Sequence, residues 1–363
     1  MKSINGLLES LNGYLLGNKA RRTCFVHMLL GMIGTRTVNL QEIALACPSK
    51  AKISSRYRRL QRFFAFFNMD LSKIACWLFD LYFRDQKQIY VLIDRTNWYV
   101  GKKKINVFML SIAYEGLAIP ILWELLEKAG CSNFEEQRKL LNRFVKLFGS
   151  KKIAGVLADR EFGNGKLFNW LTKKEIPFYI RIKEGSVAKI GEKKLWKIKK
   201  IFRDLKSNEK KCFHMAVHIF GQKVFLAGSR SERGELMIVA TNRSPKNAIA
   251  IYLRRWEIES LFQSLKGRGF RFEETHMTHP ERIAKLVALL AVGFAWSHKV
   301  GEWLALKKPI MFKRFRDSQR PQYTFFRYGL DCLRNLIFQG KCHGKEWKQC
   351  LQVLVITEPE GSL

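Results

Sequence analysis

Three acidic residues stand where their side chains could hold a metal ion. Asp94 ends a short apolar run, IYVLID, and Asp159 ends a second one, IAGVLAD, while Glu259 lies in a stretch with helical spacing. An acid at a single such position is most often a turn residue or a solvent-facing helix residue. Adjacent strand ends and a neighbouring helix can nevertheless bring three carboxylates together, and such hard oxygen ligands suit Mg²⁺ or Mn²⁺. Two ions about 4 Å apart would support an in-line phosphoryl transfer.

The stretch that carries Glu259 also carries a polar stripe. At about 100° per residue, Tyr252, Arg255, Glu259 and Lys266 fall within an arc of about 60° on a helix predicted over 247–267. Pairing of Arg255 with Glu259 four residues later explains part of this pattern. Apolar residues lie beside the stripe, so one edge of it is expected to meet the core, and a freely solvated face would not need a tyrosine.

These motifs resemble a known family. The spacing Tyr252-x₂-Arg255-x₃-Glu259-x₆-Lys266 matches the Tyr-Arg-Glu-Lys signature of bacterial insertion-sequence transposases of the DDE class, insertion sequence 4 type. The family's Asp-x-Thr motif is matched at Asp94, its Asp-Arg-x-Phe motif is matched after the fourth strand, and RGFRFEETHM and FRYGLD also look like family segments. The resemblance covers roughly residues 89–335.

The resemblance implies a fold, a chemistry and roles for individual residues. The family's catalytic domain is an RNase H-like α/β fold, a mixed sheet flanked by helices, with the first Asp on the central strand and the Glu on a later helix. It implies two Mg²⁺ ions, which Mn²⁺ can replace. The implied catalytic residues and metal ligands are Asp94, Asp159 and Glu259. The residues implied to hold DNA phosphates and a displaced base are Tyr252, Arg255 and Lys266.

The elements that must position these residues follow from apolar runs and helical spacing. The predicted strands are 89–94, 105–113, 117–126, 153–159 and 177–183. The predicted helices between them are 133–148 and 163–175. This order agrees with the mixed sheet that the resemblance implies.

The charge of the chain indicates a polyanionic partner. Lys plus Arg number 65 and Asp plus Glu number 31, so the net charge is +34 with neutral histidines. Self-repulsion at such a charge destabilises a compact fold, and nucleic acid is the partner that would offset it. The 47% hydrophobic and 13% aromatic content excludes a disordered chain. We therefore expect double-stranded DNA, as terminal inverted repeats and as target, to be the partner.

Four regions are expected. Residues 1–86 are expected to form a basic helical DNA-binding domain, and residues 87–183 with 246–280 the RNase H-like core. Residues 184–245 are expected to form a β-rich insertion. Residues 281–363 are expected to form a basic helical region for dimerisation and DNA contact. The candidate DNA contacts in the first region are Arg56, Arg58, Arg59 and Arg62. In the insertion, Trp196 is a candidate for stacking on a displaced base, with a packing role as the alternative.

The chain is expected to be cytoplasmic and nucleoid-associated, with no membrane. Its longest apolar run, Leu286–Trp296, is about half of the ~20 residues that a membrane-spanning helix needs. The eight cysteines include no C-x-x-C pair, as expected for reduced thiols.

The expected function is a DNA transposase that cleaves insertion-sequence ends and joins them to target DNA in a homodimeric complex. The sequence leaves open whether hairpin ends form. Two alternatives remain: a non-transposing endonuclease of the same fold, and a catalytically silent DNA-binding repressor.

Overall fold

The computed structural model describes residues 2–15, 17–47, 49–191, 194–315, 318–342 and 344–356 of the chain. The chain divides into two compact units. Unit 1 contains residues 1–84, 98–105 and 262–363, and unit 2 contains residues 85–97 and 106–261.

Unit 2 is organised around a mixed sheet. The order of its strands is β3-β2-β1-β4-β5-β10-β9-β8-β6-β7. The strands are β1 (Ile89–Val100), β2 (Lys103–Tyr114), β3 (Leu117–Leu125), β4 (Ile153–Ala158), β5 (Phe178–Ile182), β6 (Val187–Ile190), β7 (Lys194–Lys197), β8 (Lys210–Ile219), β9 (Gln222–Arg230) and β10 (Leu236–Thr241).

The centre of this sheet has the arrangement predicted from the sequence. Strand β1 pairs with β4 in parallel, β4 pairs with β5 in parallel, and β2 pairs with β3 in the antiparallel sense. The apolar side chains of residues 89–93 and of β4 are mostly buried, which is why these two stretches read as continuous apolar runs. Strand β1 does not end at Asp94 as predicted but continues to Val100, where Tyr99 is exposed. The predicted RNase H-like α/β fold is confirmed, with Asp94 on the central strand β1 and Asp159 directly after β4.

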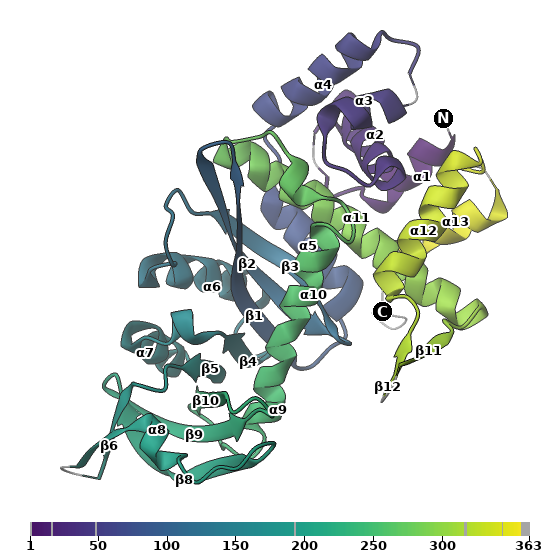
Figure 1. Cartoon of the computed structure of the whole chain (residues 1–363). Helices are drawn as coiled ribbons and strands as arrows, with labels where there is room; N and C mark the ends of the chain where they lie inside the picture. The colour runs from purple at the N-terminus through teal and green to yellow at the C-terminus, as the bar shows by residue number, and fades with distance from the viewer. Residues whose placement is uncertain are drawn as a thin grey trace, which may run out of the picture. The chain divides into compact units, whose positions relative to one another are not determined.

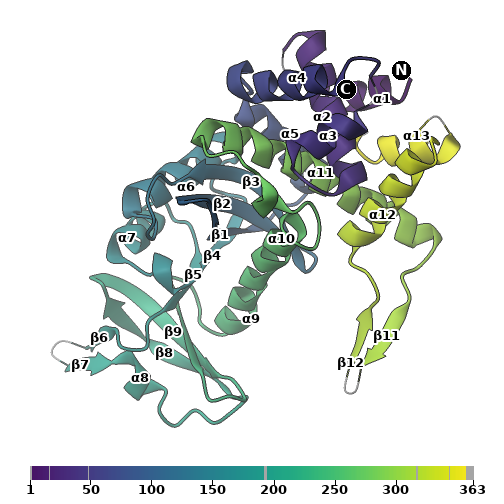
Figure 2. The same ribbon diagram turned by 45° about the horizontal axis from the view of Figure 1, so that its top comes forward.

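Helices cover both faces of the central strands. Helices α6 (Phe134–Phe148) and α7 (Gly165–Lys173) lie on one side of the sheet, and α9 (Ala248–Leu253) lies on the other (Figures 1 and 2). Asn133 and Glu136 form a capping box at the start of α6, and Asn164 caps α7, so both helices begin where the sequence predicts. Unit 2 also contains the short helices η1 (Arg160–Phe162) and α8 (Ile198–Ile201).

The prediction of one continuous helix over 247–267 was wrong. The segment folds as α9, a 3₁₀ turn η2 (Arg254–Trp256) and α10 (Glu257–Leu265). The 3₁₀ turn tightens the chain where two arginine side chains are engaged, Arg254 with Glu257 and Arg255 with Asp94. A uniform rotation of 100° per residue therefore does not describe how the polar side chains are placed.

Unit 1 is mainly helical. Its elements are α1 (Lys2–Ser10), α2 (Lys19–Thr35), α3 (Leu40–Ala46), α4 (Ile53–Phe66), α5 (Leu71–Phe83), η3 (Phe272–Glu274), α11 (Pro280–Lys307), β11 (Phe312–Phe315), β12 (Ser318–Pro321), α12 (Phe325–Phe338) and α13 (Lys345–Gln352). Helix α11 is the core helix, and α12 packs closely along it (Figure 1). A Cβ atom on Gly301 would lie 1.8 Å from the carbonyl oxygen of Phe325, so the two backbones meet at this glycine.

Helix α11 is the one helix among the described residues that is long and apolar enough to cross a membrane. Its most apolar window is 83% buried inside the structure, as in the core helix of a soluble protein. The apolar run at 286–296 therefore serves packing within unit 1.

Candidate active site

Two of the predicted acids lie on neighbouring parallel strands in unit 2, Asp94 within β1 and Asp159 directly after β4. Asp94 is on β1, and its Oδ1 accepts the backbone N–H of Arg95 at 2.7 Å. Asp159 caps η1 after β4, and its Oδ1 accepts the N–H of Arg160 at 2.7 Å. Because β1 and β4 are paired up to Ile93 and Ala158, both carboxylates leave the same edge of the sheet.

Arg255 links the first acid to the third. Its Nη1 lies 3.3 Å from Asp94 Oδ2, and its Nη2 lies 2.8 Å from Glu259 Oε1. The Arg255 side chain is only 7% exposed, whereas that of Glu259 is 51% exposed. One buried guanidinium therefore bridges two carboxylates, and the open side of this bridge is at Glu259.

Tyr252 reaches the second acid. Its hydroxyl donates to Asp159 Oδ1 at 3.3 Å, and the Arg255 guanidinium lies 5.8 Å from its ring centre. Arg181, on β5, lies 3.9 Å from Asp159 Oδ1 and adds a second cation. The structure thus gathers Asp94, Asp159, Tyr252, Arg255 and Glu259 in one place.

The electrostatics of the site follow from burial. The pKa of Asp94 is raised to about 6, mainly by burial and to a smaller extent by the negative charges of Glu161 and Asp159, against the opposing effects of the Arg95 N–H and the Arg255 guanidinium. Burial also raises the pKa of Tyr252 to about 12. Tyr252 is therefore a hydrogen-bond donor at neutral pH, and Asp94 is a carboxyl whose charge needs a neighbouring cation.

Sequence reasoning missed an ion pair that ties the two acid-bearing loops together. The Arg95 Nε donates to Glu161 Oε1 at 2.7 Å, and its Nη2 donates to Oε2 at 2.6 Å. Arg95 Nη1 also donates to Asn106 Oδ1 at 3.2 Å and to the Gly130 carbonyl at 2.9 Å. Arg95 directly follows Asp94, and Glu161 lies two residues after Asp159. The only signal in the sequence for this ion pair was that a basic residue follows one acid and an acidic residue lies close to the other.

The donor set fits a divalent metal ion in its chemistry. Carboxylate oxygens are the ligands that Mg²⁺ and Mn²⁺ prefer; two carboxylates contact Arg255, and a third, that of Asp159, accepts from Tyr252. In the arrangement seen here, Arg255 stands between Asp94 and Glu259. Over the described part of the chain, no three His, Cys, Asp or Glu side chains converge closely enough to hold one ion.

Lys266 belongs to unit 1, where its own contacts are defined. Its Nζ lies 2.7 Å from Glu273 Oε1 and 5.7 Å from the ring centre of Trp98. Trp98 is buried and packs against Phe272, with ring centres 4.4 Å apart. These contacts hold the Lys266 ammonium at the end of α10.

The remaining predicted DNA contacts differ in how free their side chains are. Trp196 is 42% exposed on β7, the edge strand of the sheet. Arg56 donates to the backbone carbonyls of Ala51 and three residues of the α3 end, and Arg59 donates to the carbonyl of Ala20. Arg58 and Arg62 are exposed on α4.

A comparison with protein families identifies the family of the chain. A family model described as "Transposase DDE domain" matches residues 85–293, more than half of the chain. A cryo-EM structure of the piggyBac transposase synaptic complex with hairpin DNA is similar, with a TM-score of 0.46 and 12% sequence identity over 99% of this chain and 84% of that one. A search of curated proteins found no match. The chain therefore belongs to the family of DDE-domain transposases, enzymes of the polynucleotidyl-transferase and nuclease class that act on DNA.

Proposed function

We propose that the protein is a cut-and-paste transposase of the insertion sequence 4 type, which cleaves DNA at the ends of its element and joins them to target DNA. The observation that carries this proposal is that Arg255 links Asp94 to Glu259, inside the region that matches the DDE domain. Tyr252, whose ring lies beside Arg255, donates to the third acid, Asp159. The Tyr-Arg-Glu-Lys spacing supports the subtype.

Transposases of the DDE family generally use divalent metals, and we infer Mg²⁺ as the ion here. Asp94, Asp159 and Glu259 would hold two ions, for which Mn²⁺ can substitute. When bound, such ions polarise phosphoryl oxygens and lower the pKa of a bound water. The raised pKa of Asp94 supports this role, because a buried carboxylate is stabilised by an adjacent cation.

The side chains around the acids act on them and on DNA. Arg255 is held in place by its two carboxylate contacts, and a guanidinium in that position can bind a phosphate in a bidentate manner. Tyr252 keeps its proton at neutral pH and orients Asp159 through its hydroxyl. Lys266, Arg255 and Tyr252 are proposed to hold the phosphates and a displaced base at the element end.

DNA binding is proposed to be dominated by phosphate contacts. The net charge of +34 supports this view. Affinity should then fall steeply with salt, with a log–log slope of about 0.9 per neutralised phosphate. A nearly flat response to salt would contradict the charge argument.

The regional division predicted from the sequence becomes part of this proposal. Residues 1–86 would bind DNA through Arg58 and Arg62. The core, residues 87–183 with 246–280, would carry out the cleavage and joining. The β-rich insertion, residues 184–245, would place Trp196 against a displaced base. Residues 281–363 would form the homodimer that pairs two DNA ends. Exposed apolar side chains of this region support such a protein contact, and they include Leu306, Met311, Phe312 and Phe338. We place the protein in the cytoplasm, on nucleoid DNA.

A strand-transfer assay tests this function directly. Pre-cut duplex ends of the element with free 3′-hydroxyls are incubated with the full-length protein, Mg²⁺ and a supercoiled plasmid. We expect joined products with the wild-type protein and with the exposed-surface variant Asp204→Asn. We expect none with Glu259→Gln. Analysis of uncut ends in parallel would reveal whether hairpin ends form.

The same assay separates the two alternatives. Cleavage of uncut ends without joining of pre-cut ends would identify a non-transposing endonuclease. Binding without cleavage or joining, in the wild type as in Glu259→Gln, would identify a silent DNA-binding repressor.

A further inference from the structure

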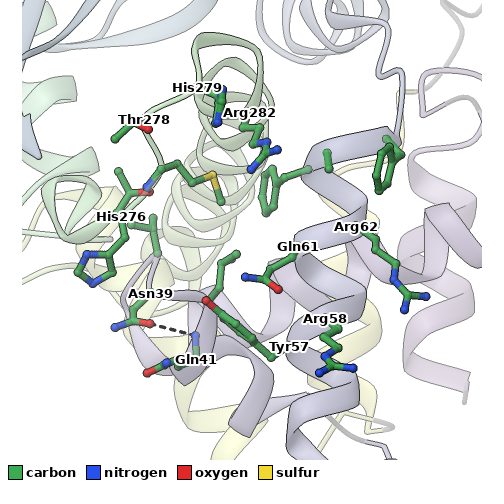
Figure 3. A pocket seen from close by; sticks show the side chains of 17 residues that line it. Asn39, Gln41, Tyr57, Arg58, Gln61, Arg62, His276, Thr278, His279 and Arg282 are labelled. Atoms are coloured by element: carbon green, nitrogen blue, oxygen red, sulfur yellow. Dashed lines mark hydrogen bonds between the residues drawn. The ribbon is translucent and has the colours of Figure 1, made fainter. Parts of the chain in front are cut away.

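Unit 1 contains a groove that the catalytic function does not use. It has a volume of about 610 Å³ and lies between the start of α3, helix α4 and the segment 275–282 that leads into α11 (Figure 3). Residues from three separate parts of the chain line it. The groove is therefore a product of the fold and not of one local motif.

The groove is basic and its positive charge is not neutralised. Arg58, Arg62 and Arg282 line it, and none of the residues lining it is Asp or Glu. Within the described part of the chain, none of these three side chains forms an ion pair or a hydrogen bond. On the same helix, the Arg56 and Arg59 side chains donate to backbone carbonyls instead. The lining arginines are thus left available for an anionic ligand.

The start of α11 adds to this positive potential. Helix α11 is 28 residues long, and its N-cap residue His279, which lines the groove, makes no side-chain capping hydrogen bond. The N-terminus of a long helix carries a partial positive charge and favours anions such as phosphate. The single acid of this first turn, Glu281, is not among the lining residues.

The walls of the groove also carry groups that suit a nucleobase. Tyr57 and Gln61 from α4 face Asn39, Gln41 and His276 across the groove (Figure 3). An aromatic ring can stack on any base, and side-chain amides match the donor and acceptor pattern of base edges. Asn39 already caps α3 through the N–H of Gln41, whereas the amides of Gln41 and Gln61 make no hydrogen bond among the described residues.

The size of the groove selects the form of the ligand. A volume of about 610 Å³ is in the range of pockets that enclose a small molecule, which run from about 300 to 1,000 Å³. A DNA double helix is too wide to enter a groove of this size, because its major groove alone is about 12 Å wide, so it could touch only the rim. One or two unpaired nucleotides would fit inside.

We propose that this groove binds an unpaired segment of a DNA strand, with phosphates on the arginines and a base against Tyr57. This inference rests on the proposed function, because unpaired nucleotides arise where DNA is opened at a cleaved end. It adds a site for single-stranded DNA, separate from the residues that perform the chemistry.

The test compares two DNA probes on the full-length protein by fluorescence anisotropy. The probes are a single-stranded oligothymidine 12-mer and a blunt 20-bp duplex, each labelled at one end. Tyr57→Leu should weaken binding of the single strand about tenfold, which is the effect of losing one base–aromatic stack, and should leave duplex binding unchanged. Gln61→Ala, at an exposed position that cannot disturb the core, should weaken the single strand in the same selective way.

Matched controls identify the charge effect. Arg62→Gln removes the charge of one residue that lines the groove, and Arg203→Gln removes one exposed charge from the β-rich part of unit 2. Arg62→Gln should reduce single-strand binding more than Arg203→Gln does.

Equal losses on both probes with Tyr57→Leu would mean that the groove contacts only duplex backbone, and no loss on either probe would mean that it does not bind DNA. Binding of a labelled oligoglutamate that depends on Tyr57 would assign the groove to an acidic protein instead. Any of these three results would overturn the proposal.

Cleavage of duplex ends by the wild type, measured in parallel, separates the two proposals. If the wild type cleaves while the groove variants show no selective loss, only the groove assignment fails. If the wild type does not cleave, the proposed function fails whatever the groove binds.

Discussion

Replacing Glu161 with glutamine should loosen the junction that sets the positions of both strand-end acids. Arg95 holds Glu161 through two short charge-assisted hydrogen bonds, of 2.7 and 2.6 Å, and the two side chains are 11% and 23% exposed. The variant keeps the shape of the side chain and removes its charge. The Arg95 guanidinium then remains in a mostly buried position without its anion.

The size of the effect follows from the degree of burial. Breaking a fully buried ion pair from one side costs about 3–5 kcal/mol, and an exposed pair is worth about 0–1 kcal/mol. The partial exposure of this pair places the expected loss between these limits, at about 2 kcal/mol in the free energy of unfolding. For a unit of this size, such a loss lowers the melting temperature by about 4–8 °C.

Urea denaturation and DNA cleavage should be measured on the same preparations. Glu135→Gln is the matched control, because Glu135 pairs with Arg138 at 2.7 Å on the exposed surface of α6, and its loss should change stability by less than about 0.5 kcal/mol. Cleavage by Glu161→Gln should also slow at temperatures where the protein stays folded, since the pair fixes the loop that follows Asp159. A Glu161→Gln protein as stable and as active as Glu135→Gln would refute the role assigned to this pair.

Three further predictions concern other parts of the molecule. Arg255→Lys should reduce cleavage at least about tenfold without unfolding the protein, because an ammonium cannot bridge two carboxylates as the guanidinium does; unchanged single-turnover rates would contradict this role. Gly301→Ala should lower the free energy of unfolding by at least about 2 kcal/mol, because the new Cβ would lie 1.8 Å from the Phe325 carbonyl oxygen. The control is Gly34→Ala on α2, whose new Cβ would meet only an ordinary contact at 3.7 Å. Thermal denaturation should show no change in stability for this control. Burial lowers the pKa of His298 to about 3, so its contribution to stability is complete above about pH 6.5 and is lost as the pH falls toward 3, by up to about 1.4 kcal/mol per pH unit. A His298→Gln protein should show a flatter pH dependence of stability between pH 6.5 and 4, and identical slopes would argue against this assignment.

The sequence predicted the central sheet because buried parallel strands have a simple signature. The runs that became the first half of β1 and all of β4 are apolar on both faces and are followed by an acid, and the two strands lie side by side in parallel, as the expected proximity of Asp94 and Asp159 requires. The helical spacing over 133–148 likewise predicted α6, whose N-cap is Asn133. Local chemistry was sufficient in these places, and the acids proposed to be catalytic on the sheet, Asp94 and Asp159, were noticed because each ends an apolar run.

The parts that sequence reasoning missed depend on contacts between distant residues. Glu161 is 66 positions from Arg95, and no local pattern pairs them. The 3₁₀ turn at Arg254–Trp256 follows from the side-chain contacts made there, which helical periodicity does not contain. The groove in unit 1 required three separate segments to meet, so its composition could be read only from the fold.

The most direct test of the central claim is metal-dependent cleavage of a labelled DNA that carries the element's own terminal repeats. Wild type, Glu259→Gln and the control Asp204→Asn are compared with and without Mg²⁺, and binding to the same DNA is measured in each case. We predict cleavage at the repeat boundary by the wild type and Asp204→Asn in Mg²⁺, and none by Glu259→Gln although it still binds. Cleavage that persists in Glu259→Gln, or binding without cleavage in all three proteins, would contradict the assignment of Asp94, Asp159 and Glu259 as the catalytic centre.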